Sequence, residues 1–185
     1  DPLHNAHLGG LSDAKEIRLP DGKKVDEVII LLGTRHIQKP IEGMSLEDRV
    51  LTLKAVLDGA KDKGVILADK FFIVNTGWYV EMAEAVRRYY QEVYNQQIET
   101  YFIVGKDAMQ VTLNPRLEKR LAKTLTENKF IVMDRAGERI EDTEEYKQNE
   151  RFWPNIYPLA FKLQKEQASI SSTKIREMVR NSASV

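Results

Sequence analysis

The chain contains no cysteine and only three histidines, so the usual metal ligands and nucleophiles of many enzymes are scarce. Without cysteine, neither a disulfide framework nor a zinc or redox site built on thiolates is available. The longest uncharged apolar run, VIILLG, is far too short to span a bilayer. The 28 basic and 28 acidic residues cancel, which argues against a broad nucleic-acid-binding surface. Any bound anion must therefore be held by a local site.

The remaining composition is that of an ordinary globular protein, with 42% hydrophobic and 30% charged residues among 185. This length predicts a single domain over residues 1–185 with a substantial core. The lack of cysteine removes the main sequence evidence for secretion, and we expect a cytoplasmic location, with the nucleus as an open alternative. The pattern does not indicate the oligomeric state, and a homo-oligomer stays open.

Short β-branched runs alternate with helical patterns along the chain, which predicts an α/β protein with a mostly parallel sheet and helices on both faces. The strands are expected at residues 25–33, 65–74, 101–105, 130–135 and 155–163. The polar segment from Ala136 to Arg151 is the best candidate for a mobile loop with a short helix.

Three apolar stripes at helical spacing lie between these strands. The first covers residues 45–61, where Ser45 followed by Asp48 predicts an N-terminal cap. The stripes consist of Leu46, Val50, Leu53, Leu57 and Ala60, then Met82, Val86, Tyr89 and Val93, and finally Leu117, Leu121 and Leu125.

Ligands of such sheets bind outside the carboxyl ends of the strands, so the residues just after each strand matter most. These segments are GTRHIQK after Leu32, NTGWY after Val74, GKDA after Val104 and DRAG after Met133.

Near the end of the chain, ISSTKIREMVR predicts a helix that begins close to Ser172, with hydroxyl residues as caps. Its first turn carries Lys174 and Arg176, cations that the positive end of a helix dipole disfavours by about 0.3 to 1 kcal/mol each. A bound anion would compensate, because free N–H groups, hydroxyls and two cations together form a phosphate site. The alternative is that both cations simply point into solvent.

The first residues, DPLHNAHL, place His4 and His7 three positions apart near the start of a possible helix. Histidines there could donate hydrogen bonds to a phosphate and be stabilised as cations by it. A metal site is an alternative, but only His36 remains as a further histidine, so carboxylates would have to complete it. A chance pair on a surface loop is the other alternative.

Together, DPLHNAHL and ISSTKIR resemble the two signature motifs of the nucleotidyltransferase superfamily, FDPxHxGHL and ISSTxIR, and the resemblance runs along nearly the whole chain. Within that superfamily the chain is most similar to the nicotinamide or nicotinate mononucleotide adenylyltransferases. VGKDA resembles their G-x-D segment, FIVMDRAGE their strand ending in R-x-G, SLEDRVLTL an arginine-bearing helix, and NTGWY a segment whose tryptophan stacks on the pyridine ring. The resemblance implies a Rossmann-like doubly wound parallel sheet of about five to six strands.

The chain departs from the family pattern in three places. Ala6 stands where the family has the glycine of HxGH. The glycine-rich strand that precedes this motif is absent, so we expect such a strand upstream of residue 1. The proline-rich loop of the bacterial nicotinate enzymes is not recognisable in GTRHIQKPIEG, which leaves the choice between amide and acid open.

The resemblance implies transfer of AMP from ATP to nicotinamide or nicotinate mononucleotide in NAD biosynthesis, with pyrophosphate as the leaving group. The attacking phosphate is already an anion, so the reaction needs positioning and charge neutralisation rather than a general base. Mg²⁺ is expected as a cofactor bound mainly through the ATP phosphates, and no protein ligand set can be named.

The same resemblance assigns roles to individual residues. His7, secondarily His4, and Arg176 would stabilise the charge that develops on the phosphates. A tryptophan at a helix start is often core, so Trp78 could instead pack, and Lys39, Arg49 and Arg135 could be surface cations. Phe152 and Trp153 are expected to pack rather than bind. The ATP-binding residues would be Gly105, Asp107, Ser172, Thr173, Lys174 and Lys39, and the mononucleotide-binding residues Trp78, Arg49 and Arg135.

Two other functions compete with this one. A phosphopantetheine adenylyltransferase usually shows T-x-G-H and a shorter chain, whereas HNAH and Trp78 point away from it. A non-catalytic nucleotide-binding relative is the alternative from a different class, with Ala6 as a sign of lost activity.

Overall fold

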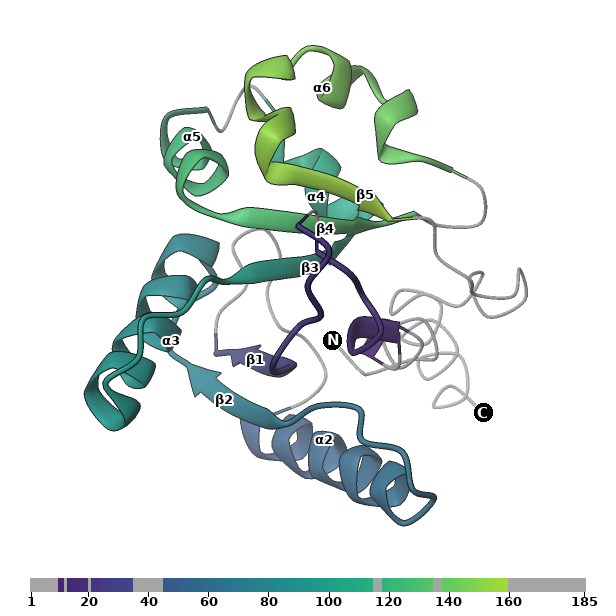
Figure 1. The fold of residues 1–185 in the computed structure, drawn as a ribbon, viewed down its shortest axis with the longest axis vertical. Helices are drawn as coiled ribbons and strands as arrows, with labels where there is room; N and C mark the ends of the chain where they lie inside the picture. Colours follow the sequence, from purple (N-terminus) through teal and green to yellow (C-terminus); the bar gives the residue numbers. More distant parts are fainter. Residues whose placement is uncertain are drawn as a thin grey trace, which may run out of the picture. The chain divides into compact units, whose positions relative to one another are not determined.

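The structure, a computed structural model, describes residues 10–11, 13–19, 21–34, 45–114, 118–134 and 138–159 (Figure 1). The described residues up to Asn75 belong to one compact unit, and those from Thr76 onward belong to a second. The expectation of a single domain over residues 1–185 stays a prediction.

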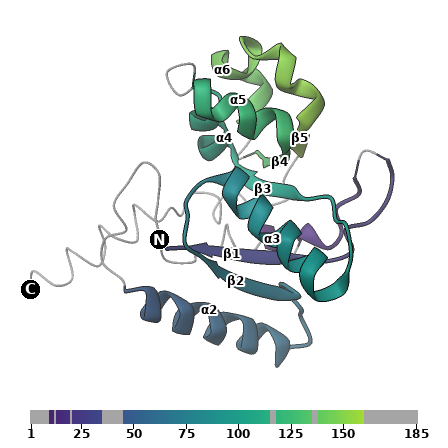
Figure 2. The same ribbon diagram turned by 90° about the vertical axis from the view of Figure 1, so that its left-hand side faces the viewer.

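The first unit contains a two-stranded parallel sheet and one long helix. Strand β1 (Ile29–Gly33) pairs with β2 (Lys70–Val74), and helix α2 (Leu46–Lys61) lies between them in the chain. Figure 2 shows α2 lying beside this sheet. The two strands begin four and five residues later than the predicted runs at 25 and 65, and the ladder starts only at the pair of Ile29 and Lys70.

Helix α2 begins where the sequence predicts. The Asp48 N–H donates to the Ser45 hydroxyl at 3.0 Å, and the Asp48 carboxylate accepts from the Ser45 N–H at 3.2 Å, which completes a capping box. Of the predicted apolar stripe, Leu53 is buried whereas Leu46 is 37% exposed. The cap prediction is confirmed, and the centre of the stripe is the part that packs.

Asp69 joins three parts of the first unit. One carboxylate oxygen accepts from the Lys15 ammonium at 2.7 Å, and the other accepts from the Val28 N–H at 2.8 Å, just before β1. Burial would raise the pKa of Asp69, but these two bonds and the nearby Lys70 outweigh it, so its pKa lies below the usual value. Asp69 therefore ties the segment around Lys15 to the starts of β1 and β2.

The second unit contains a three-stranded parallel sheet in the order β3-β4-β5. Arg87 on its first helix donates to the Thr100 hydroxyl at 2.8 Å and to the Asn128 side chain at 3.2 Å. The helix is thereby tied to the starts of two strands. The elements are α3 (Tyr79–Tyr94), β3 (Tyr101–Gly105), α4 (Lys106–Thr112), α5 (Glu118–Glu127), β4 (Lys129–Met133), the 3₁₀ turn η2 (Ile140–Asp142), α6 (Glu144–Lys147), the 3₁₀ turn η3 (Glu150–Asn155) and β5 (Ile156–Leu159).

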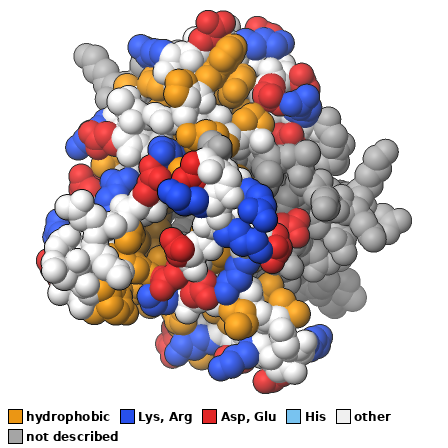
Figure 3. Space-filling view, in the orientation of Figure 1, with side chains coloured by type: hydrophobic (Ala, Val, Ile, Leu, Met, Phe, Trp, Pro, Cys, Tyr) orange, Lys and Arg blue, Asp and Glu red, His pale blue; other side chains and the backbone are white. Residues whose placement is uncertain are grey.

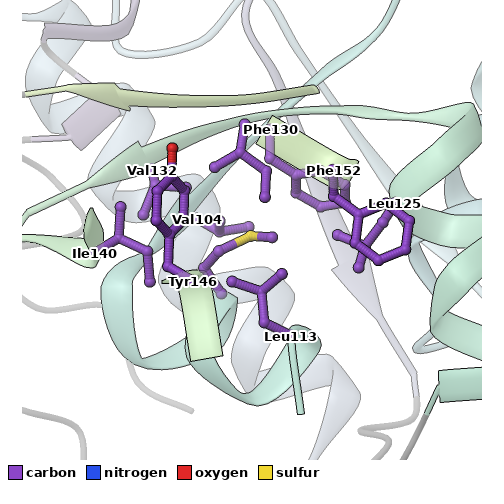
Figure 4. Packing of buried hydrophobic residues seen from close by; sticks show 10 residues of the cluster. Val104, Leu113, Leu125, Phe130, Val132, Ile140, Tyr146 and Phe152 are labelled. Carbon is purple, nitrogen blue, oxygen red and sulfur yellow. The ribbon is translucent and has the colours of Figure 1, made fainter. Parts of the chain in front are cut away.

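The core of the second unit lies between its sheet and the helices that follow the strands. Phe130 and Val132 of β4 are fully buried, and Figure 4 shows them among side chains from α5, α6 and η3. Burying a phenylalanine or leucine side chain contributes about 1.5 to 3 kcal/mol each. The labelled members are Val104, Leu113, Leu125, Phe130, Val132, Ile140, Tyr146 and Phe152.

Helix α3 forms as predicted, but its buried face is turned by about one residue. Ala83, Val86 and Tyr90 are buried, whereas Val93 of the predicted stripe is 55% exposed. The series beginning at Tyr79 also repeats at helical spacing, and the Tyr79 ring packs against Phe102 and Phe130, with ring centroids 5.0 and 5.5 Å apart. Aromatic packing at the first turn therefore decides which side of the helix faces the core.

The polar segment expected as a mobile loop is folded over its described part, residues 138–151. It contains the expected short helix, α6, together with η2. Ile140 is fully buried and Tyr146 lies in the same core cluster. The expected short helix is confirmed, and the segment around it also contains 3₁₀ turns, because these two apolar side chains, spaced among charged residues, anchor it to the core.

The class of the fold is confirmed as α/β with parallel strands, and the arrangement is compatible with a Rossmann-like fold. The described strands form two sheets, of two and three strands, rather than one sheet of five to six.

We expect Asp69→Asn to lower the free energy of unfolding by about 1 kcal/mol at pH 7, because the amide keeps an acceptor for Val28 but loses the charge that Lys15 binds. A lowered pKa in the folded state adds stability above the unfolded pKa of about 3.9, and this is lost as pH falls through the folded pKa. Urea unfolding should therefore show the variant and the natural protein converging in acid. Glu16→Gln, in the exposed pair with Lys24, is the control and should change little. Equal stability of Asp69→Asn and the natural protein at pH 7 would contradict this role.

Candidate functional site

Polar side chains gather at the carboxyl ends of the strands in both units, where α/β proteins bind their ligands. In the first unit, β1 and β2 end opposite each other, with Gly33 paired to Val74. The next residues, Thr34 and Asn75, are joined by a hydrogen bond of 2.8 Å from the Thr34 hydroxyl to the Asn75 side-chain oxygen. The Thr34 N–H continues the ladder by donating to the Val74 carbonyl at 2.9 Å. This edge is therefore held by both backbone and side-chain bonds.

Arg49 of α2 reaches the same edge. Its terminal nitrogen donates to the Gly33 carbonyl at 3.0 Å, and its Nε is buried without a hydrogen-bond partner in the part of the chain described. Burial lowers the pKa of Arg49, yet a guanidinium remains a cation at any physiological pH. A buried donor without a partner lowers the stability of the folded protein. The Nε–H of Arg49 is therefore a donor that a ligand with a hydrogen-bond acceptor would satisfy.

In the second unit, Gly105 ends β3 and precedes α4, and Asp107 lies exposed in the first turn of that helix. A methyl group built on Gly105 would meet nothing within 4 Å, so packing does not require glycine there. Lys106, whose side chain is 13% exposed, is ion-paired with Glu138, whose side chain is 69% exposed. The pair ties the segment after β4 to the start of α4. The predicted positions of Gly105 and Asp107 at a strand end are as the structure has them, and their ATP-binding roles stay predictions.

Asp134 follows β4 at the same edge of this sheet. Its carboxylate accepts from the Ile140 N–H at 3.2 Å. Burial raises the pKa of Asp134, and this outweighs that hydrogen bond and the nearby Arg139. The partial burial of this carboxylate disfavours its ionised form, so the ionised Asp134 lowers the stability of the folded protein.

Trp78 caps the start of α3 with its backbone. Its N–H donates to the Thr76 hydroxyl at 3.1 Å, and that hydroxyl is bonded in turn to Glu81. The side chain is half-buried, and the neighbouring Tyr79 supplies the core contact of this turn. Stacking of Trp78 on a pyridine stays a prediction.

The expected packing of Phe152 and Trp153 is confirmed. Phe152 is buried in the core cluster. The Trp153 ring stacks on Tyr146 with centroids 5.2 Å apart, and its indole N–H donates to the Tyr146 carbonyl at 3.0 Å. Both aromatic residues therefore serve the folded segment that follows β4.

The structure brings together only part of the predicted site. Gly105 and Asp107 are neighbours on one strand end, whereas Arg49 belongs to the other unit. Eight predicted residues lie outside the described residues, namely His4, His7, Lys39, Arg135, Ser172, Thr173, Lys174 and Arg176.

Three polar residues at strand ends, Thr34, Asn75 and Asp134, were not singled out from the sequence. The signal that could have found them is their place, because each is the first residue after a strand. The four segments expected to matter include all three. The residues predicted from these segments were instead the cations Lys39 and Arg135 and the aromatic residue Trp78.

The part of the chain that the structure describes lacks two kinds of feature. No group of three or more histidine, aspartate or glutamate side chains there is placed to hold a metal ion. No helix in that part of the chain is long and apolar enough to cross a membrane. On the face shown in Figure 3, positive and negative side chains are interspersed rather than gathered by sign.

The parallel strands and the helices between them place the protein in the α/β class, in which the carboxyl ends of the strands are the usual place for a ligand. A family model described as cytidylyltransferase-like matches residues 1–178. The chain therefore belongs to the cytidylyltransferase-like family, within the nucleotidyltransferase superfamily, and the family supports a nucleotidyltransferase activity. A comparison with curated protein sequences gave no match.

We expect Asp134→Asn to unfold at a higher temperature than the natural protein at pH 7, because the amide keeps the acceptor for Ile140 and cannot ionise. A pKa raised by folding means that stability is full below about 3.9, the unfolded value, and declines as pH rises towards the folded pKa. The advantage of the variant should therefore vanish in acid. Thermal unfolding at several pH values measures this, with Asp26→Asn, at an exposed aspartate of the other unit, as control. A variant less stable than the natural protein at pH 7 would refute it.

Proposed function

We propose that the protein is an adenylyltransferase that transfers AMP from ATP to nicotinamide or nicotinate mononucleotide, giving NAD or its deamido form and pyrophosphate. The observation that carries the proposal is the presence of both DPLHNAHL and ISSTKIR within the stretch that the family model matches. Family membership supports nucleotidyl transfer. The resemblance of NTGWY and VGKDA to segments of the pyridine mononucleotide adenylyltransferases favours ATP and a pyridine mononucleotide as the substrates.

The reaction is a displacement at phosphorus. An oxygen of the mononucleotide 5′-phosphate forms a bond to the α-phosphorus of ATP, and the bond from that phosphorus to the bridging oxygen breaks. Pyrophosphate leaves with the electron pair. No proton must be removed from the attacking oxygen, so the residues have to position the phosphates and neutralise their charge.

The proposed roles follow the two motifs and the strand ends. His7 and His4 donate to phosphate oxygens of ATP, and Arg176 with the Ser172 and Thr173 hydroxyls holds the β- and γ-phosphates. Lys174 and Lys39 add positive charge there. Mg²⁺ bound to the phosphates would supply further neutralisation, with phosphates and water as its main ligands.

The described residues support the nucleoside end of this proposal. Asp107, exposed at the end of β3 beside the open Gly105, is proposed to accept hydrogen bonds from the ribose hydroxyls of ATP. Trp78, half-buried at the start of α3, is proposed to stack on the pyridine. Arg49 and Arg135 are proposed to bind the mononucleotide, and the unpartnered Nε of Arg49 supports the first of these.

The substrate pair is tested by measuring pyrophosphate release with ATP or CTP as donor and three acceptors, nicotinamide mononucleotide, nicotinate mononucleotide and phosphopantetheine. We expect release with ATP and a pyridine mononucleotide only, with a dinucleotide product of matching mass. Turnover with phosphopantetheine alone or with CTP alone would replace the proposed substrates. ATP binding without turnover of any acceptor would establish a non-catalytic protein.

We expect His7→Ala to lower kcat by about 10²- to 10³-fold, because a donor to the phosphates in the transition state is removed. Circular dichroism and the melting temperature should stay unchanged. His36→Ala is the matched control, since His36 is the remaining histidine and has no proposed role. Steady-state kinetics with saturating ATP measures both, and a kcat of His7→Ala within twofold of the natural value would exclude the role.

A further inference from the structure

The hydrogen bond between Thr34 and Asn75 fixes what this strand end offers to a ligand. The Thr34 hydroxyl donates to the Asn75 amide oxygen at 2.8 Å, which engages one of the two lone pairs of that oxygen and turns it towards Thr34. The NH₂ group on the other side of the Asn75 amide carries two donors. Asn75 is exposed, whereas Val74 before it is buried, so the amide lies where the strand reaches the surface.

Arg49 adds donors of the same kind at this edge. Its contact with the Gly33 carbonyl places the guanidinium at the end of β1, and Gly33 is the residue paired with Val74, immediately before Asn75. The buried Nε of Arg49 has no partner among the described residues. The edge thus combines N–H donors with one positive charge, and none of its three side chains is acidic. An oxyanion satisfies such a set, because it carries only acceptors and a compensating charge.

We propose that Asn75 binds the second substrate by hydrogen-bonding one of its oxyanions, with Arg49 as a cation at the same strand end and Thr34 as the residue that orients the Asn75 amide. The identity of the second substrate as a pyridine mononucleotide rests on the proposed function, whereas the preference for an oxyanion rests on the geometry of this edge. The oxyanion is either the 5′-phosphate or the carboxylate of a pyridine ring, and these share the same hydrogen-bonding chemistry.

The decisive variant is Asn75→Asp, which has the same shape and still accepts from Thr34 but replaces the NH₂ donors with a negative oxygen. We expect it to raise the mononucleotide KM about tenfold or more, a loss typical of a charge-assisted hydrogen bond, and to leave the ATP KM within about twofold. A merely structural role would move the melting temperature and both KM values together. The expected melting temperature is unchanged.

Thr34 is tested through the orientation of the amide. Thr34→Val keeps the shape and removes the hydroxyl, which frees the Asn75 amide to rotate, so we expect a smaller rise in the mononucleotide KM of about threefold. Thr34→Ser should restore the natural value. Thr126→Val is the matched control, since the Thr126 hydroxyl donates to the Ala122 carbonyl of its own helix. A Thr34→Ser variant no better than Thr34→Val would refute the orienting role.

The two sources of the oxyanion give different results with Asn75→Asp. A bound phosphate predicts equal rises of KM for nicotinamide and nicotinate mononucleotide, whereas a bound carboxylate predicts a rise for nicotinate mononucleotide alone. Either result supports the proposal. A KM within twofold of the natural value for both substrates overturns it.

Nuclear magnetic resonance of the ¹⁵N-labelled chain distinguishes a failure of the proposed function from a failure of the oxyanion site. The Asn75 NH₂ resonances, assigned by their loss in Asn75→Asp, should shift when nicotinamide mononucleotide, nicotinate mononucleotide, AMP or CMP is added. Shifts without turnover of a pyridine mononucleotide would overturn the proposed function and keep the oxyanion site. No shift with any of the four probes would overturn the site itself.

Discussion

In both units the strands are held side by side by parallel backbone ladders, with Gly33 opposite Val74 in one and Gly105 opposite Met133 in the other. Parallel pairing makes all strands of a sheet end at the same edge, so residues far apart in the chain become neighbours there. The contact between Thr34 and Asn75 depends directly on this register. A slip of one strand by one residue would turn the side chains of that strand to the opposite face and so separate these two groups.

The polar strand ends are supported by apolar packing of different depth in the two units. Around β4, Phe130 and Val132 have no exposed surface, and the segment after the strand is folded back onto them through Ile140. In the first unit the strand β1 that ends at this edge is only half-buried. The Asp69 carboxylate accepts a hydrogen bond from the Val28 N–H, just before that strand. The carboxylate of Asp134 therefore lies in a more desolvated setting than the Asn75 amide, which accounts for the raised pKa of Asp134.

Element type and order could be predicted from the sequence, because the β-branched runs and the Ser45 cap are local signals that the tertiary structure leaves intact. The buried side of α3 could not, because Tyr79 and Val93 both fit a helical stripe and the aromatic partners that decide between them come from other strands. The folded segment around Ile140 was hidden for a similar reason, since two apolar residues among many charges show no period.

The residues of the candidate site also fall into those that a local sequence signal predicts and those that only tertiary contacts reveal. Motifs with a recognisable spacing, as around His7 and Arg176, can be read without a structure. Thr34 and Asn75 lie in segments that the sequence marks as important, but the hydrogen bond that joins them spans 41 positions of sequence and no local pattern predicts it. Hydrogen-bond direction is likewise invisible in a sequence, although it decides whether an amide presents donors or acceptors to a ligand.

The parallel ladders also determine how the chain must fold. A parallel pair cannot close through a tight turn, and β1 meets its partner only after the whole of α2 has intervened. Such non-local pairing slows folding, because loop-closure entropy must be overcome before any ladder bond forms. During synthesis the backbone of β1 stays without its partner until Lys70 and the residues after it have left the ribosome, whereas α2 can form early and shorten the distance between the two strands.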